Sequence, residues 1–254
     1  MRIIISPAKK MNRDTDSMAV RGLPAFMDET RLLTREIQKL SLKEARALWQ
    51  CNEKLAELNY ERFQNMDLEK ALTPAVLAYE GLQYQHMAPA IFTDAAFAYI
   101  EEHLRILSGF YGVLKPLDGV TPYRLEMKAQ LPVDGKKNLV DFWGDKLYRE
   151  VIHGDRTILN LASKEYADTI EKYLKPGDHF ITVYFGELSD GSVRQKGTFA
   201  KMARGEMARF MAERNITEPE EIRDFCELGL RYSEALSDDS RYIFLKDPET
   251  AKEA

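Results

Sequence analysis

The segment RILSGFYGVLKPLDGVTPYRLEMK, residues 105–128, combines an aliphatic run with three glycines, two prolines and several charged side chains. A regular core strand would not contain so many turn-favouring residues, and an ordinary surface loop would not be so apolar. Glycine lets the backbone approach another group closely, and the neighbouring cations can bind an anion. We therefore expect this segment to line a concave anion-binding surface, with DNA as the expected anion.

The end of this segment, PYRLEM at residues 122–127, alternates in the way that predicts an extended strand. Arg124 and Glu126 would then share one face, and Tyr123 would lie on the other. An arginine beside a glutamate is typical of an internal ion pair. Alternatively, Glu126 holds Arg124 so that its remaining donors face a phosphate. We take Tyr123, Arg124 and Glu126 as candidate site residues.

A second cationic region is VRQKGTFAKMARGEMARFM, residues 193–211. Its five cations and single anion give a local charge of +4 in a chain whose net charge is −5. Helical periodicity places Lys201, Arg204 and Arg209 opposite the apolar residues, with Gly205 among them. A glycine at that position would let a ligand approach the cations closely. The alternative interpretation is a helix whose charged face is simply solvated.

Three further candidates lie elsewhere in the chain. Lys9 follows the first expected strand, a position that often carries functional side chains, and Lys115 lies within the opening segment. Asn160 lies at a junction between a strand and a helix, where free backbone N–H groups can bind an anion. Capping by Ser163 explains that junction equally well.

The composition limits the classes of protein that fit. The chain has 254 residues, 44% hydrophobic and 30% charged, which is typical of an ordinary globular protein. It has no apolar run long enough to span a membrane and no signal-peptide core, so we expect a cytoplasmic protein. The four histidines and two cysteines lack metal-ligand spacing, and we expect neither a metal nor a cofactor.

Strands and helices are mixed without steady alternation, which favours an α+β fold. We expect one compact domain, residues 1–254, with a central mixed sheet wrapped by helices. The strands are expected near 2–6, 156–163 and 241–246, with a hairpin over 179–197 that turns at Asp190-Gly191. The helices are expected over 28–40, 41–63, 93–104, 140–152, 163–175, 198–213 and 219–225, and another is expected from Thr73-Pro74.

Four motifs carry a resemblance to a known family: ISPAKKM (5–11), RILSGFYGVLKPLDGVTPYRLEM (105–127), NLASKEY (160–166) and KGTFAKMARGEMARF (196–210). In order and spacing they resemble the landmarks of the YaaA peroxide-stress family, over essentially the full length. The resemblance implies a cytosolic protein that limits free iron and oxidative damage during hydrogen peroxide stress. It also implies a positively charged cleft and a DNA-binding helix-hairpin-helix-like element, which best matches a helix ending near Leu107 followed by SGFYGV.

Three hypotheses about function follow, and the sequence does not decide whether the chain is an enzyme. In the first, Lys9, Lys115, Arg124, Lys201, Arg204 and Arg209 bind the backbone of double-stranded DNA without reading its sequence. In the second, the same surface forms an enzyme pocket that acts on a nucleotide or another small phosphorylated substrate. This pocket would also contain Tyr123, Asn160 and Glu126. An open groove would favour DNA, and a pocket of a few hundred Å³ would favour the small substrate. The third is direct sequestration of iron, which would need a carboxylate site because the histidines and cysteines are not clustered.

Overall fold

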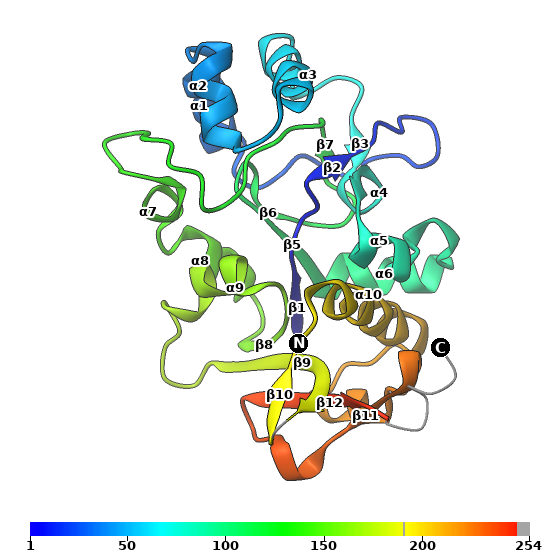
Figure 1. Ribbon diagram of the computed structural model, residues 1–254. Coiled ribbons are helices and arrows are strands. Elements are labelled where there is room, and N and C mark those ends of the chain that lie inside the picture. Colours follow the sequence, from blue (N-terminus) through cyan, green and yellow to red (C-terminus); the bar gives the residue numbers. More distant parts are fainter. Residues whose placement is uncertain (190, 248–254) are drawn as a thin grey trace.

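The computed structural model describes residues 1–189 and 191–247 (Figure 1). The strands are β1 (Arg2–Ile5), β2 (Lys10–Met11), β3 (Thr73–Pro74), β4 (Tyr79–Glu80), β5 (Leu104–Ser108), β6 (Gly112–Leu114), β7 (Gly119–Val120), β8 (Thr157–Leu161), β9 (His179–Ser189), β10 (Ser192–Arg194), β11 (Leu230–Tyr232) and β12 (Arg241–Lys246). The α-helices are α1 (Met27–Gln38), α2 (Leu42–Trp49), α3 (Glu53–Gln64), α4 (Ala75–Ala78), α5 (Leu82–Met87), α6 (Asp94–His103), α7 (Leu139–Trp143), α8 (Lys146–Val151), α9 (Lys164–Glu171) and α10 (Gly197–Arg214). The 3₁₀ helices are η1 (Pro89–Ile91), η2 (Pro219–Asp224), η3 (Glu227–Gly229) and η4 (Glu234–Leu236).

The main sheet has eight strands in the order β11-β12-β9-β8-β1-β5-β6, with β10 paired to β9. The five strands β12, β9, β8, β1 and β5 are parallel to one another, whereas β6, β10 and β11 pair antiparallel at the margins. The predicted mixed sheet wrapped by helices is therefore confirmed. The chain leaves β1 toward β5 on one side and later returns to β8 on the other side. The carboxyl end of β1 is thus a topological switch point, where open α/β sheets commonly bind ligands.

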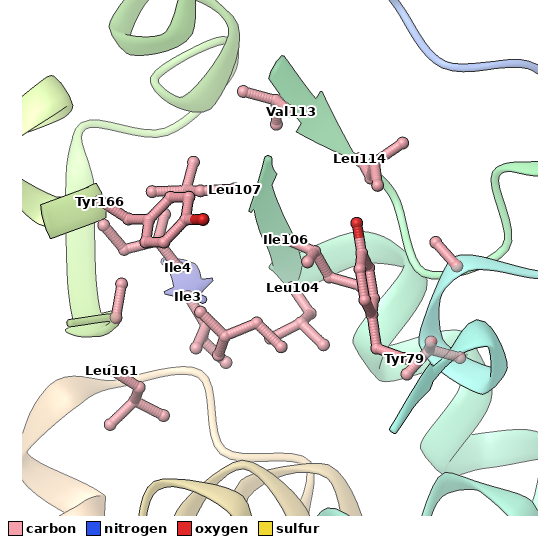
Figure 2. Packing of buried hydrophobic residues seen from close by; sticks show 14 of the residues in the cluster. Ile3, Ile4, Tyr79, Leu104, Ile106, Leu107, Val113, Leu114, Leu161 and Tyr166 are labelled. Atoms are coloured by element: carbon pink, nitrogen blue, oxygen red, sulfur yellow. The ribbon is translucent and has the colours of Figure 1, made fainter. Parts of the chain in front are cut away.

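Helices cover both faces of this sheet. In Figure 1, α8 and α9 lie on one side of β1, and α5, α6 and α10 lie on the other. Figure 2 shows the same division at the level of side chains: Tyr166 lies on the side of β5 that carries Leu107, and Tyr79 on the side that carries Ile106. Because both faces of the central strands are buried, β1 reads as a continuous apolar run, Ile3 to Ile5, rather than an alternating one.

Several local predictions are confirmed. Ser41 and Glu44 form the expected capping box of α2, and Thr93 caps α6 through its side chain. Strands β1, β8 and β12 and helices α1 and α10 lie where expected, and β9 and β10 form the expected hairpin. At its turn, Gly191 has φ +73°, whereas Asp190 is outside the described residues.

Four predicted elements were wrong in extent or type. The helix expected over 41–63 is broken at Gln50, which adopts a left-handed conformation, and the one over 140–152 is broken at Gly144. Residues 73–74 form a short strand, and the helix after them spans only Ala75–Ala78. Residues 121–126 are extended but pair with no strand, although the predicted alternation of buried and half-buried side chains is present from 123 to 127.

The helix-hairpin-helix interpretation of SGFYGV was also wrong. Helix α6 ends at His103, and residues 104–108 are strand β5, so the turn at 109–111 joins two antiparallel strands. The segment is buried throughout, and Ser108 Oγ accepts hydrogen bonds from the N–H groups of Phe110 and Tyr111. Its glycines serve internal packing, because a Cβ on Gly109 would lie 2.6 Å from the carbonyl oxygen of Leu125.

Gly205 likewise serves packing rather than the close approach of a ligand. It is buried where α10 crosses α5, and a Cβ there would lie 2.2 Å from the carbonyl oxygen of Gln83. No side chain fits at that distance, so glycine lets the two helices pack backbone to backbone. Among the helices of residues 1–189 and 191–247, none is long and apolar enough to cross a membrane.

This packing predicts that Gly205→Ala destabilises the fold although alanine favours helices. Separating α10 from α5 should cost about 1–3 kcal/mol of unfolding free energy, the usual cost of overpacking. The measurement is thermal or urea unfolding followed by circular dichroism. Gly197→Ala is the matched control. Gly197 lies at the N-terminal end of the same helix, where a Cβ would have no neighbour within 4 Å. Equal unfolding midpoints for the two variants would contradict the packing role of Gly205.

Candidate functional site

A pocket of about 520 Å³ opens at the carboxyl end of β1, at the switch point of the sheet. Its walls come from the loop after β1, the β4–α5 connection, the extended segment 121–126, the start of α9, and α10. These segments are far apart in sequence. The polar residues of its lining are Ser6, Lys9, Lys10, Glu80, Gln83, Tyr84, Tyr123, Arg124, Glu126, Ser163, Glu165, Tyr166, Lys201 and Arg204.

The pocket therefore brings together six of the nine candidate residues: Lys9, Tyr123, Arg124, Glu126, Lys201 and Arg204. Its lining carries five cations and three carboxylates, a net charge of +2, in a chain whose net charge is −5. The local clustering of cations that an acidic chain would need to hold an anion is thus present.

Most of these charges are paired across the pocket wall. Glu126 lies between two cations, with Oε2 2.9 Å from Lys9 Nζ and Oε1 3.2 Å from Arg124 Nη2. The contact to Arg124 is an ion pair without hydrogen-bond geometry, since Glu126 Oε1 has no hydrogen-bond partner. Lys10, in β2, forms an ion pair with Glu80, in β4. The predicted pairing of Arg124 with Glu126 is thus confirmed.

Arg204 and Lys201 differ from the other cations of the pocket. Within the described residues, neither side chain makes an ion pair or a hydrogen bond, and only Lys201 is exposed. Burial lowers the pKa of Arg204 from its ordinary value, because the charged guanidinium loses water without gaining a counter-ion. Arginine nevertheless stays protonated in proteins, so Arg204 is a half-buried cation without a partner among the described residues.

Unpaired donors are concentrated in this pocket. Across residues 1–189 and 191–247, six buried side-chain polar atoms lack a hydrogen-bond partner, and five belong to pocket residues. Two are the ion-paired oxygens of Glu80 and Glu126, and the other three are N–H donors: Gln83 Nε2, Arg124 Nε and Arg204 Nε. Buried donors normally have acceptors, so these three indicate a place for a ligand that supplies them.

Three tyrosines form the aromatic part of the lining. Tyr84 donates to the carbonyl oxygen of Ser6, and Tyr123 Oη lies 2.8 Å from Tyr79 Oη and 2.6 Å from Ser108 Oγ. Burial raises the pKa of Tyr123 to about 12 and the pKa values of Tyr84 and Tyr166 well above their ordinary range. At neutral pH these side chains are uncharged phenols, which add apolar surface to the pocket.

Asn160 lies outside the pocket lining and is satisfied within the chain. Its Oδ1 accepts from the N–H of Ala162 at 2.8 Å, and its Nδ2 donates to Thr182 Oγ1 at 3.2 Å. Ser163 stands at the N-cap of α9, but its side chain does not cap the helix, which differs from the expected capping. Its Oγ instead accepts from Ser6 Oγ at 3.2 Å, and its N–H donates to Ser6 Oγ at 2.8 Å. This pair ties the loop after β1 to the start of α9.

Lys115 and Arg209 lie in other hollows. Arg209 is ion-paired to Glu213, 2.7 Å away, beside Glu206 and Glu227. Lys115 borders a cavity of about 270 Å³ that also contains Arg105 and Asp118. The structure therefore does not bring these two cations to the pocket.

Sequence reasoning missed Glu80, Gln83 and Tyr84 as pocket residues. In the sequence, YEGLQY (79–84) reads as an ordinary helix entry, and its only signal is Gly81. A Cβ on Gly81 would lie 3.1 Å from the Cβ of Ala8, so this glycine lets the β4–α5 connection lie against the loop after β1. In the described parts of the chain, no group of three or more His, Cys, Asp or Glu side chains is arranged to hold a metal ion.

The Lys115 cavity generates a prediction about pH. Burial raises the pKa of Asp118 to about 6, so the carboxyl stabilises the fold when protonated and loses that contribution as pH rises through 6. Asp118→Asn should therefore gain stability relative to the parent chain between pH 4 and pH 7, by at most about 3 kcal/mol. Urea unfolding at several pH values measures this difference.

Asp238→Asn is the control of opposite sign. Arg241 and Ser240 hold the pKa of Asp238 below its ordinary value, so the ionised carboxylate stabilises the fold. Asp238→Asn should therefore become less stable than the parent chain as pH rises. A stability difference for Asp118→Asn that does not change with pH would contradict the raised pKa.

Comparison of the sequence with known proteins places this chain in a family. The profile of the family described as "Peroxide stress protein YaaA" matches residues 1–236. A UPF0246 protein of Desulfitobacterium hafniense is 55% identical over 97% of this chain and 98% of its own length. UPF0246 proteins of Agathobacter rectalis and Pediococcus pentosaceus are 54% and 48% identical, each over 98% of its own length. The chain therefore belongs to the YaaA family of peroxide stress proteins.

Proposed function

We propose that this chain is a peroxide stress protein that acts in the cytoplasm by binding a small phosphorylated ligand in the pocket at the end of β1. The observation that carries the proposal is Arg204, a half-buried cation with a buried, unpaired Nε and no counter-ion among the described residues. A buried charge without a partner is costly, and an anionic ligand removes that cost. Phosphate oxygens fit the planar donors of arginine well.

The size of the pocket supports a small ligand. A volume of about 520 Å³ lies within the usual range for sites that enclose small molecules and cofactors. Lys201, one helical turn before Arg204 on α10, lies exposed beside it and adds a second unpaired charge for the same phosphate.

The same arrangement offers one group for proton transfer. Glu126 is a carboxylate held between Lys9 and Arg124, and it lines the pocket. If the bound ligand is a substrate, Glu126 is the acid or base that we assign to the reaction. Membership of the family suggests that the protein limits free iron. In this proposal, that limitation follows from the binding or conversion of the ligand.

The test compares Arg204→Gln with Arg209→Gln, two identical changes on α10. Inorganic phosphate and ribose 5-phosphate should raise the melting temperature of the parent chain. Both should bind Arg204→Gln at least 10-fold more weakly, because a charge-assisted hydrogen bond contributes about 1.5–3 kcal/mol. Arg209→Gln should bind like the parent, since Arg209 is paired with Glu213 outside the pocket. Isothermal titration calorimetry measures the affinities, and equal affinities for all three proteins would refute the proposal.

Binding to the DNA backbone is a second candidate, favoured by the lysines at the pocket mouth. The side chains of Lys9 and Lys10 are 66% and 79% exposed, and Lys201 is exposed beside them. A DNA duplex is too large to enter the pocket, but these three cations can contact the phosphates of its backbone. Contacts of this kind position a protein on DNA without reading its sequence.

For this candidate, duplex affinity should fall with salt with a log–log slope of about −3, one contribution from each of three phosphate contacts. Replacing Lys9, Lys10 and Lys201 together with Gln should bring the slope close to zero. Replacing Lys43, Lys54 and Lys137, three exposed lysines elsewhere, makes the same change in net charge and should leave the slope unaltered. Fluorescence anisotropy with a labelled duplex measures both slopes, and the same slope in all three proteins counts against DNA binding at this face.

A further inference from the structure

The two sides of the pocket differ in how their charges are compensated. On the α10 side, Lys201 and Arg204 have no ion-pair partner in the described chain. On the side of the loop after β1, each cation has a carboxylate, with Glu126 serving both Lys9 and Arg124. A ligand that matches this distribution is anionic at one end and neutral but polar at the other.

The lining between these two sides is aromatic and apolar. Tyr84, Tyr123 and Tyr166 are only 4%, 4% and 6% exposed, and they meet Leu82 and Leu125 in the same pocket. Tyrosine rings of this kind bind flat, apolar groups, and here the phenols carry no charge that would oppose them. A sugar phosphate alone would leave much of this surface without a partner.

The neutral side also offers hydrogen-bond groups of both kinds. Arg124 Nε is a buried donor without an acceptor, and the Glu126 carboxylate accepts. Guanidinium donors pair well with the ring nitrogens and carbonyls of a nucleobase, and a carboxylate is the usual partner of ribose hydroxyls. The pocket also lies at the switch point of a parallel sheet, the place where such folds commonly bind nucleotides.

We propose that the phosphorylated ligand is a nucleotide of the nucleoside monophosphate class. Its phosphate lies at Arg204 and Lys201, and its base and ribose lie along the tyrosines toward Arg124 and Glu126. This inference rests on the proposed function, because it assumes the phosphate site at Arg204. It adds the identity and the orientation of the rest of the ligand.

The experiment is calorimetric titration of the full chain with five probes: inorganic phosphate, ribose 5-phosphate, adenosine, AMP and GMP. At least one of the two nucleotides should bind 10-fold or more tightly than ribose 5-phosphate, and AMP should bind 10-fold or more tightly than adenosine. Arg204→Gln should remove the preference for AMP over adenosine. Tyr166→Leu should remove the preference for nucleotide over ribose 5-phosphate, whereas Tyr166→Phe, which keeps the ring, should retain it.

The outcomes separate the two proposals. If ribose 5-phosphate binds the parent chain as tightly as both nucleotides, and still depends on Arg204, the nucleotide inference is overturned while the phosphate pocket survives. If no phosphorylated probe depends on Arg204, both are overturned. The comparison of probes on the parent chain decides the matter even if the Tyr166 variants fail to fold.

Discussion

Strand β1 has a parallel neighbour on each side, and this pairing fixes where everything that forms the pocket must lie. Ile3 pairs with Leu104 of β5 on one side and with Leu159 of β8 on the other, so both edges of β1 are hydrogen-bonded and the strand is held between β5 and β8. Residues 6–10 must then emerge between the segments that follow β5 and β8. The pocket is the space between those segments, and its position follows from the order of the strands.

Three glycines set how closely the walls of this space approach one another. Gly109 lies under the backbone of 125–127, Gly81 lies against Ala8, and Gly205 lies against α5. At each of these positions a side chain would push apart two segments, at least one of which carries pocket residues. Arg124 and Arg204 therefore face one pocket because backbones pack closely behind them, and the glycines contribute to the site without touching a ligand.

Sequence reasoning succeeded where the determining contacts are local. The Ser41–Glu44 capping box and the apolar run of β1 depend on neighbours a few residues away. It failed where distant segments decide the outcome. The glycines beside cations indicated ligand approach, but their close neighbours are other parts of the chain. SGFYGV follows a real helix, α6, yet residues 104–108 form a strand because β1 offers them a parallel edge. Gln83 could not be found, because a buried pocket amide has the same sequence pattern as an exposed helical one.

The negative net charge of the whole chain is compatible with a pocket whose lining has a positive net charge. Several surface charges on this protein pair locally, often three or four residues apart on a helix, and such pairs add little stability. Arg204 lies half-buried next to the helix crossing at Gly205, with a buried Nε and no such partner among the described residues. A neutral or apolar side chain at position 204 would remove the desolvation cost, so packing alone does not account for a charge there. A buried donor that has no acceptor within the chain, such as Arg204 Nε, is a position where a ligand completes the structure.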